Sequence, residues 1–413
     1  MLYFFKISCV FLKNCTFGSK RKQMNYILFD GSVRSHLLPF TFTRPVAEIR
    51  VGILTIREKW ERYLNTTTST ITEDYLSEKW PMVEMEENVM INASFIPTPE
   101  LVEQVKNLQP GEGIFHEEDI VAFHAYEEQE VDFNDCKHIE LEGKPVVVEH
   151  TWDIFRLNGE AITADFELLV QDRSSQKLSS TNQVIAPENV FLEEGAKVEC
   201  AILNASEGPI YIGVDAQIME GSIVRGPFAL GDHAVLKMGA KIYGSTTVGP
   251  HSKVGGEVNN SVIFGYSNKG HDGYLGNSVL GEWCNLGADT NTSNLKNNYA
   301  EVRLWDYATG RFAHTGLQFC GLIMGDHSKC SINTMFNTGT VVGVSANIFG
   351  AGFPRNFVPS FSWGGSGGTT TYQTSKAFEV AEKVMERKEV EFSEEDKAIL
   401  EQVFEDTKQY RRD

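Results

Sequence analysis

Side chains suited to acid–base and phosphate chemistry are concentrated between residues 257 and 303. The polar segments are Glu257-Val-Asn-Asn-Ser-Val-Ile263, Asn268-Lys-Gly-His271-Asp-Gly-Tyr274-Leu-Gly276, Asn285-Leu-Gly-Ala-Asp-Thr-Asn-Thr-Ser-Asn294-Leu-Lys296 and Glu301-Val-Arg303. An imidazole such as that of His271 ionises near neutral pH and can therefore accept a proton from a bound group. A guanidinium such as that of Arg303 can hold a phosphate through two donors. We therefore predict a ligand site in this stretch.

The candidate site interrupts a repeat with a period of six residues. Buried-type side chains recur in two registers, at Ile212, Ile218, Val224, Leu230, Leu236, Ile242, Val248 and Val254, and again at Met324, Cys330, Phe336, Val342 and Ile348. A period of six is typical of a triangular coil in which three hexads make one turn and each aliphatic side chain points inward. The glycines that follow four of these positions are expected to provide corner conformations that a β-carbon would hinder. The sequence thus predicts a left-handed parallel β-helix over about residues 190–361, with the polar segments in its loops.

The remaining chain divides around this repeat. Residues 24–172 are predicted to form an α/β domain, residues 173–363 the β-helix domain, and residues 364–413 a C-terminal helical tail. The elements expected in the first domain are strands at Asn25–Asp30 and Val89–Ala93, and helices at Ile53–Leu64, Thr98–Leu108 and Asp153–Leu169. Thr98 is expected to cap the N-terminus of its helix. Residues 1–23 precede a second methionine, and we interpret them as an extension upstream of the true start. A membrane or export tag is the alternative.

The tail is expected to begin with a flexible break, Gly364-Gly-Ser-Gly-Gly368. Two amphipathic helices should follow, the first over Thr374–Lys388 and the second capped by Ser393 with Asp396 three residues later. We expect these helices to lie on the open end of the β-helix or on a neighbouring subunit, where they would protect the last coil's edge.

Composition excludes some classes of function. The 413 residues carry a formal net charge of −19, which disfavours a nucleic-acid-binding protein because such proteins need a basic face for phosphates. The seven cysteines form no CxxC pair, which indicates a reduced, cytoplasmic protein. The apolar run near the start is too short to span a bilayer, so no membrane association is predicted.

The polar segments resemble the acetyltransferase half of the bifunctional enzymes that make UDP-N-acetylglucosamine, and their archaeal sugar-1-phosphate relatives. The resemblance rests on the three stretches at 257–263, 270–276 and 285–295 and extends over about residues 212–350. It implies that His271 is the general base for acetylation of an amino-sugar 1-phosphate by acetyl-CoA. It further implies that Tyr274, Asn294 and Arg303 bind the sugar phosphate, and that the enzyme is a homotrimer with sites between subunits. This chain departs from the family at Asn259 and Ala300, where bacterial enzymes have lysines.

The segment Asn25–Pro45 resembles the opening of sugar-1-phosphate nucleotidyltransferases, which have a Rossmann-like α/β fold. Pro39-Phe-Thr41-Phe-Thr-Arg44-Pro45 fits the family spacing, and the resemblance makes Gly31 and Arg34 nucleotide-binding residues. The family lysine is Val46 here, and the family's Mg²⁺-binding aspartate corresponds to Asn92-Ala-Ser94, which has no carboxylate. No metal ligand is therefore predicted, and Mg²⁺ and a nucleoside triphosphate are implied only if this domain is active. Asp153 and Asp165 remain alternative sources of a carboxylate.

Two other functions stay open at this stage. The departures at Val46, Ser94, Asn259 and Ala300 would suit a non-catalytic sugar-nucleotide-binding or scaffold protein, and nucleotidyltransferase activity alone is a further alternative. Some left-handed β-helices are zinc-dependent carbonic anhydrases that hold the metal with three histidines. His271, His314 and His327 lack the closely spaced pair that such a site uses, which disfavours this alternative.

Overall fold

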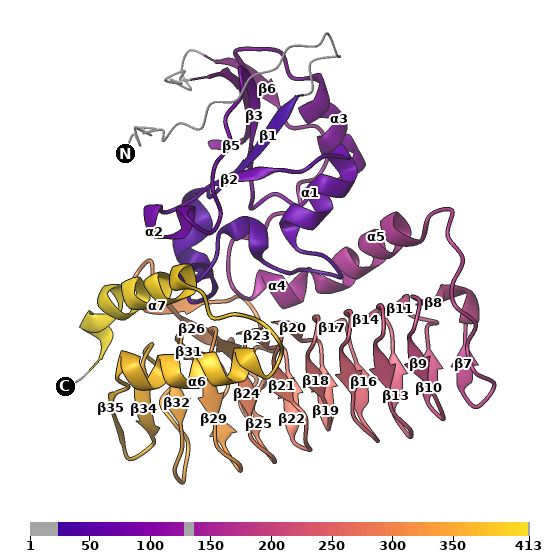
Figure 1. Cartoon of the computed structure of the whole chain (residues 1–413), viewed down its shortest axis with the longest axis vertical. Helices are drawn as coiled ribbons and strands as arrows, with labels where there is room; N and C mark the ends of the chain where they lie inside the picture. Colours follow the sequence, from indigo (N-terminus) through magenta and orange to yellow (C-terminus); the bar gives the residue numbers. More distant parts are fainter. Residues whose placement is uncertain (1–23, 128–135, 412–413) are drawn as a thin grey trace. The chain divides into compact units, whose positions relative to one another are not determined.

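The computed structural model describes residues 24–127 and 136–411 (Figure 1). The predicted upstream extension, residues 1–23, lies outside the described residues. The described chain forms two compact units: one contains residues 24–31, 45–47 and 56–147, and the other contains residues 32–44, 48–55 and 148–411. None of the helices in the described ranges has the length and apolar character needed to cross a bilayer.

The first unit is an α/β domain built on a mixed six-stranded sheet in the order β2-β1-β3-β5-β4-β6. Its strands are β1 (Asn25–Phe29), β2 (Ser69–Ile71), β3 (Glu87–Asn92), β4 (Glu112–His116), β5 (Asp119–Tyr126) and β6 (Lys137–Glu140). Its helices are α1 (Ile56–Leu64), α2 (Asp74–Ser77) and α3 (Pro99–Asn107). The predicted cap is present, because the Thr98 side chain accepts a hydrogen bond from the backbone N–H of Leu101.

Helix α1 begins three residues later than expected. The backbone N–H groups of Ile53 and Leu54 both donate to a carboxylate oxygen of Asp165, at 2.8 and 3.1 Å. These two residues therefore belong to a turn held by a buried side chain rather than to the helix, which starts at Ile56.

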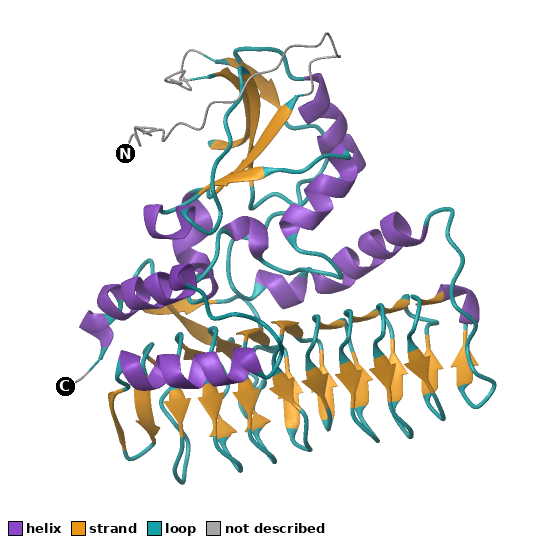
Figure 2. Ribbon diagram, viewed as in Figure 1, coloured by secondary structure: helices purple, strands orange, loops and turns teal. Residues whose placement is uncertain are grey.

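The second unit contains the β-helix, in which three parallel sheets form the faces of the coils (Figure 2). The first face contains β7 (Gln183–Ile185), β10 (Ile202–Asn204), β13 (Ile223–Arg225), β16 (Lys241–Tyr243), β19 (Glu257–Asn259) and β22 (Tyr274–Gly276). The second contains β8 (Val190–Leu192), β11 (Ile210–Ile212), β14 (Phe228–Leu230), β17 (Thr246–Val248), β20 (Val262–Gly265), β23 (Val279–Glu282), β28 (Leu322–Met324), β31 (Thr340–Val342) and β33 (Phe357–Val358). The third contains β9 (Lys197–Val198), β12 (Gln217–Ile218), β15 (Val235–Leu236), β18 (Lys253–Val254), β21 (Asn268–Lys269), β24 (Asn285–Leu286), β29 (Lys329–Cys330), β32 (Asn347–Ile348), β34 (Ser362–Gly365) and β35 (Gly368–Thr371).

The core of the β-helix confirms the hexad registers. Leu236 pairs with Ile218 on one side and Val254 on the other, and all three side chains are buried. The second register is buried as well, from Met324 to Ile348. Between the two registers the coils continue through β19 to β24. β25 (Asn291–Thr292) then pairs with β30 (Met335–Phe336) of the second register, and the antiparallel hairpin of β26 (Arg303–Asp306) and β27 (Arg311–His314) is inserted between them.

The expectation for the glycine corners was wrong. Glycines such as Gly249 do not have positive φ; they are required because a β-carbon on Gly249 would lie 1.8 Å from the carbonyl oxygen of Phe264 in the next coil. Other glycines, such as Gly221 and Gly239, do have positive φ, at 75° and 70°. One line of left-handed positions is filled by rings, at His233, His251, Tyr266, Trp283 and His327, with φ between 53° and 61°. These rings stack from coil to coil at centroid distances of 4.8, 4.7, 4.2 and 6.2 Å in chain order.

The C-terminal segment differs from the prediction at two points. Gly364–Gly368 is not a flexible break but the turn of the antiparallel hairpin β34–β35, which extends the third face beyond residue 363. Helices α6 (Thr374–Glu386) and α7 (Glu394–Asp406) form as expected, with the capping box of Ser393 and Asp396. They lie beside the coils rather than on the open end, because the ring of Phe392 meets His327 and that of Phe404 meets Phe361.

The helix predicted over Asp153–Leu169 is divided into α4 (Asp153–Arg156) and α5 (Asn158–Val170). Ile162 and Leu169 of α5 pack in one apolar cluster with Phe191, Tyr211 and Ala229 on the second face of the β-helix. Both helices therefore fold with the β-helix unit, although the sequence analysis assigned them to the N-terminal domain.

Candidate functional site

The loop between β21 and β22 carries His271. Its side chain is exposed and its ring forms no hydrogen bond or ion pair with the residues that the structure describes. The loop is held from inside the coil by Lys269, whose Nζ donates to the carbonyl oxygens of Gly255, at 2.9 Å, and of His271, at 2.8 Å. The backbone of the candidate base is thus fixed, while its imidazole is open to a substrate.

Lys269 occupies a position that aliphatic side chains fill in the other coils. It pairs with Val254 across β18 and β21, and its side chain is 2 % exposed. Burial lowers the pKa of its ammonium to about 8, a shift that the nearby charges of Asp272 and Asp289 partly offset. A lysine two residues from His271 is therefore part of the inner support of this loop.

Tyr274 and Asn294 meet in the structure although twenty residues separate them in sequence. The Nδ2 of Asn294 donates to the hydroxyl oxygen of Tyr274, at 3.0 Å, and to Oδ1 of Asn277, at 2.8 Å. The Tyr274 ring lies over Gly276, where a β-carbon would come within 2.3 Å of the tyrosine hydroxyl. Glycine at 276 therefore provides the space in which the two predicted ligand-binding side chains come together.

The surroundings of Tyr274 are polar and partly buried. Burial raises the pKa of its hydroxyl, and hydrogen bonds with Asn259 and Asn294 act in the opposite direction. The Tyr274 backbone N–H is fixed by Oδ1 of Asn291 at 2.9 Å. Asn259, at a position where bacterial enzymes of the resembled family have lysine, thus forms part of a neutral amide and hydroxyl cluster that suits the hydroxyl groups of a sugar.

Arg303 lies outside this cluster. It is exposed at the start of the β26–β27 hairpin, opposite His314, and among the described residues it forms no hydrogen bond or ion pair with His271, Tyr274 or Asn294. Lys296, by contrast, closes its own loop by donating to the carbonyl oxygen of Glu301 at 2.6 Å. Within one chain the structure thus brings Tyr274 and Asn294 together and leaves Arg303 separate.

In the first unit, Gly31 follows β1 and faces the end of β3. A β-carbon at Gly31 would lie 2.7 Å from Oδ1 of Asn92, so these two positions adjoin. Asn92 is occupied by local bonds, since its Oδ1 accepts from the N–H and hydroxyl of Ser94, at 3.1 and 2.9 Å. The strand end that resembles a metal-binding position therefore presents an amide and a hydroxyl.

Arg34 and Arg44 lie in the segment 32–44, which folds with the β-helix unit. Arg34 Nη2 donates to the carbonyl oxygen of Thr41 at 2.6 Å, which fixes the loop on itself. Arg44, in the stretch that resembles a triphosphate loop, is 6 % exposed and is ion-paired with Asp326 and with Glu282, the latter at 3.4 Å. Burial alone would lower the pKa of Arg44, but attraction to both carboxylates outweighs it and raises that pKa.

One group of three potential metal ligands occurs within the described ranges: Glu149, His150 and Asp153. Asp153 is already engaged, because its Oδ2 accepts from the N–H groups of residues 149 and 150 and its Oδ1 accepts from Arg156 at 2.9 Å. Asp165 holds the turn at Ile53 and Leu54. Both aspartates that remained as alternative metal ligands thus have structural roles in this chain.

Comparison with known proteins finds relatives for both parts of the chain. Residues 26–174 match the family described as sugar nucleotidyl transferase. A bifunctional sugar-1-phosphate nucleotidylyltransferase/acetyltransferase of Sulfurisphaera tokodaii is 26% identical over 215 residues, 52% of this chain and 47% of that protein. The bifunctional protein GlmU of Methanocaldococcus jannaschii is 34% identical over 87 residues, 21% of each chain. The chain thus spans less than half the length of either relative that it matches.

Among solved structures, an Arabidopsis UDP-N-acetylglucosamine acyltransferase aligns with 46% of this chain and 71% of its own, at 15% identity and a TM-score of 0.22. The polySia-specific acetyltransferase NeuO aligns with 46% of this chain and 84% of its own, at 16% identity and a TM-score of 0.24. The sequence comparisons confirm the resemblance drawn from the residues: the chain carries a sugar nucleotidyl transferase match over residues 26–174 and is similar to the bifunctional sugar-1-phosphate nucleotidylyltransferase/acetyltransferases.

Proposed function

We propose that the β-helix transfers an acetyl group from acetyl-CoA to the amine of an amino-sugar 1-phosphate, a step in the synthesis of a nucleotide sugar such as UDP-N-acetylglucosamine. The observation that carries this proposal is the Tyr274–Asn294–Asn277 hydrogen-bond cluster, which includes the first residue of the strand that follows the loop of the exposed His271. The cluster offers neutral donors and acceptors for sugar hydroxyls, and the imidazole can accept a proton.

The chemistry assigns one step to each group. Neutral His271 takes a proton from the substrate amine, whose nitrogen attacks the thioester carbonyl carbon. The carbon–sulfur bond then breaks, and the CoA thiolate takes the proton from His271 and leaves as the thiol. Tyr274 and Asn294 hold the sugar, and Arg303 binds the phosphate. Because Arg303 stands apart from the cluster within one chain, its role favours a site completed by a neighbouring subunit of a homotrimer.

The test is to incubate the protein with acetyl-CoA and a panel of hexosamine 1-phosphates and to follow free thiol. His271→Ala should lower the rate by roughly 10²–10⁴-fold, the usual loss when a general base is removed. His138→Ala is the matched control, because His138 is also exposed and lies on β6 of the first unit, outside the proposed site. If His271→Ala keeps near-full activity with an unchanged pH profile, deprotonation of the amine alone explains the rate, and His271 is not the base.

A second proposal concerns residues 26–174, which match the sugar nucleotidyl transferase family: we infer that this part of the chain does not transfer nucleotides and acts as a sugar-nucleotide-binding or structural region. Arg44 is committed to Asp326 and Glu282, and Asn92 to Ser94, so neither is available to triphosphate or metal. Nucleotidyl transfer without a metal-binding carboxylate is hard to achieve.

This second proposal is tested by assaying Mg²⁺-dependent pyrophosphate release from UTP or dTTP with sugar 1-phosphates. We expect no release above the level without sugar. Robust release would show that another carboxylate holds the ion, and it would leave the acetyltransferase proposal untouched.

A further inference from the structure

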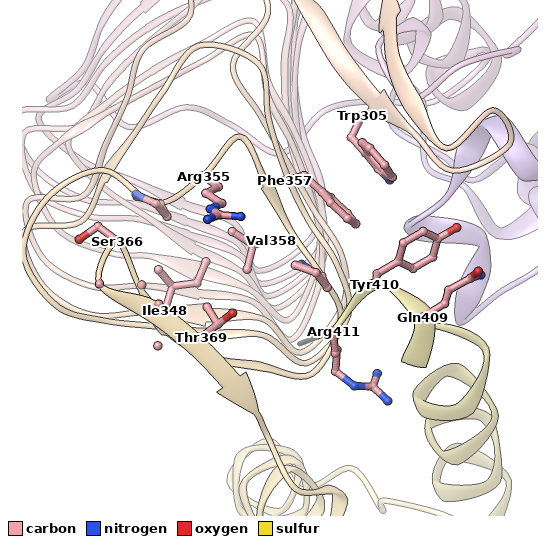
Figure 3. A pocket seen from close by; sticks show the side chains of 16 residues that line it. Trp305, Ile348, Arg355, Phe357, Val358, Ser366, Thr369, Gln409, Tyr410 and Arg411 are labelled. Atoms are coloured by element: carbon pink, nitrogen blue, oxygen red, sulfur yellow. The ribbon is translucent and has the colours of Figure 1, made fainter. Parts of the chain in front are cut away.

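A cavity of about 560 Å³ lies at the C-terminal end of the β-helix (Figure 3). It is bounded by the turn of the β34–β35 hairpin, by β33, by Trp305 of the β26 strand and by the short 3₁₀ helix Lys408–Tyr410. Its volume lies within the range of about 300–1,000 Å³ that is usual for small-molecule sites. None of the roles proposed above uses this cavity.

The charge of the cavity is opposite to that of the protein. The chain has a formal charge of −19, yet no carboxylate is among the described residues that line the cavity. Arg355 is exposed at its wall and forms no hydrogen bond or ion pair with other described residues. Arg411, in contrast, donates to Thr407 Oγ1 and to the Phe404 carbonyl, and its side chain runs away from Arg355 (Figure 3). Arg355 is therefore the guanidinium available for an anion.

Aromatic rings form the opposite wall. Trp305 stacks on Phe357 with ring centroids 4.3 Å apart and planes 12° apart, and Tyr410 meets Trp305 edge-on at 6.0 Å. Trp305, Phe357 and Tyr410 are partly exposed and line the cavity, so they offer apolar ring surface to a flat ligand.

We propose that this cavity binds a nucleoside phosphate, with the phosphate on Arg355 and the base against Trp305 and Tyr410. Inorganic phosphate alone would leave the aromatic wall uncovered, and an uncharged aromatic compound would leave Arg355 unused. A nucleoside phosphate matches both features, because its phosphate can pair with Arg355 and its base has a flat face for the rings.

The cavity is separate from the loop of His271. Strand β21 precedes that loop, and β34 lies four strands further along the third face, a distance of roughly 19 Å at the usual strand spacing.

The same ligand chemistry has two sources, a free nucleotide or the nucleotide end of acyl-CoA. The second source rests on the proposed acetyltransferase function, whereas the first does not.

The test is calorimetric titration of ADP into the full chain, with adenosine and inorganic phosphate as partial ligands. We expect ADP to bind more tightly than either part, and Arg355→Ala to weaken ADP at least tenfold. Arg311→Ala, which removes an exposed arginine outside the cavity, is the matched control and should bind like wild type. Tyr410→Ala removes one ring of the aromatic wall, and should also weaken ADP binding while leaving phosphate binding unchanged.

No ADP binding by the wild-type protein, or equal binding by wild type and Arg355→Ala, would overturn the proposal. The two sources are separated by the KM for acetyl-CoA in the thiol assay. A raised KM with unchanged kcat in Arg355→Ala identifies the CoA nucleotide as the occupant, and an unchanged KM together with lost ADP binding identifies a free nucleotide. If no acetyl transfer is found at all, the ADP titration still decides whether the cavity is a nucleotide site.

Discussion

Burial of the Lys269 ammonium, next to the loop of the candidate base, lowers the free energy of unfolding by an amount that depends on pH. The pKa of Lys269 is lowered to about 8 in the folded protein, from 10.5, mainly by burial. Between pH 8 and 10.5 the unfolded chain therefore binds more protons at this position than the folded one, so stability rises with pH through this window. The full difference corresponds to about 3 kcal/mol.

The rise of stability with pH can be tested with Lys269→Met, which approximates the length of the side chain and removes its charge. The melting temperature of wild type relative to this variant should rise from pH 7 to pH 10, because only the wild type gains stability by losing the proton. Lys253→Met, at an exposed outward position on the preceding coil, is the control and should show a constant difference from wild type. A flat difference for Lys269→Met as well would mean that this ammonium is not destabilised by burial.

Individual residues were predictable to different degrees. The pairing of Tyr274 with Asn294 could be anticipated, because both belong to stretches that match one family in order. Lys269 and Asn277 were missed as parts of the site. Leu236 pairs with Val254 eighteen residues later, but Val254 pairs with Lys269 after only fifteen, so the hexad count loses register at that coil. Likewise, the local sequence around Arg44 gives no sign of Asp326, which lies far along the chain.

At the scale of elements, the six-residue repeat correctly predicted which side chains of each strand point into the coil, and this can be tested by mutation. Leu236 is fully buried inside the coil, whereas its neighbour Val235 points outward beside Lys253. Leu236→Asp should destabilise the protein by about 3 kcal/mol or more, because it buries a carboxylate without a partner.

The matched control is Val235→Asp, which places the same carboxylate one residue away on the outer surface and next to a lysine. We expect it to remain soluble with a melting temperature close to that of wild type. Equal melting temperatures for the two variants would contradict the assignment of Leu236 to the inside and Val235 to the outside of the coil. A thermal scan of both variants is sufficient to decide.

Element types were predicted better than turns. The helix caps at Thr98 and Ser393 were correct, because capping depends on side chains one to three residues away. The glycine-rich turn was misjudged as flexible. Gly364 and Gly368 have φ of 136° and 126°, which fits them to the ends of a hairpin whose partner strand supplies the hydrogen bonds. Composition alone does not distinguish a loose linker from a tight turn that needs glycine.

For the whole molecule, the outer surface of the first face favours self-association. Ile185, Ile202 and Ile223 are 53%, 37% and 48% exposed at its N-terminal end, and the Tyr274 cluster lies at the other end of the same sheet. Exposed aliphatic side chains aligned on neighbouring strands are typical of a surface that another chain covers.

We therefore expect a trimer, with a mass by light scattering of about three times the 46.2 kDa chain. Ile202→Asp and Ile223→Asp together should shift the protein toward monomer and should lower acetyl transfer, because the proposed site needs Arg303 from a neighbour. The exposed Ile332, which lies on another part of the β-helix, provides the control in Ile332→Asp. A wild-type protein that is monomeric and active would contradict the shared site.

The stacked rings at His233, His251, Tyr266, Trp283 and His327 provide a spectroscopic signal that reports on unfolding of the β-helix. Tyr266 and Trp283 lie face to face at 4.2 Å, close enough for their electronic transitions to couple and to produce a near-ultraviolet circular dichroism band. Because the strands of each coil pair only with those of the adjacent coils, fraying that begins at an end of the β-helix proceeds coil by coil. The circular dichroism band therefore persists while the terminal coils unfold, and it disappears when β20 separates from β23. Its loss during melting shows that unfolding has reached the middle of the β-helix.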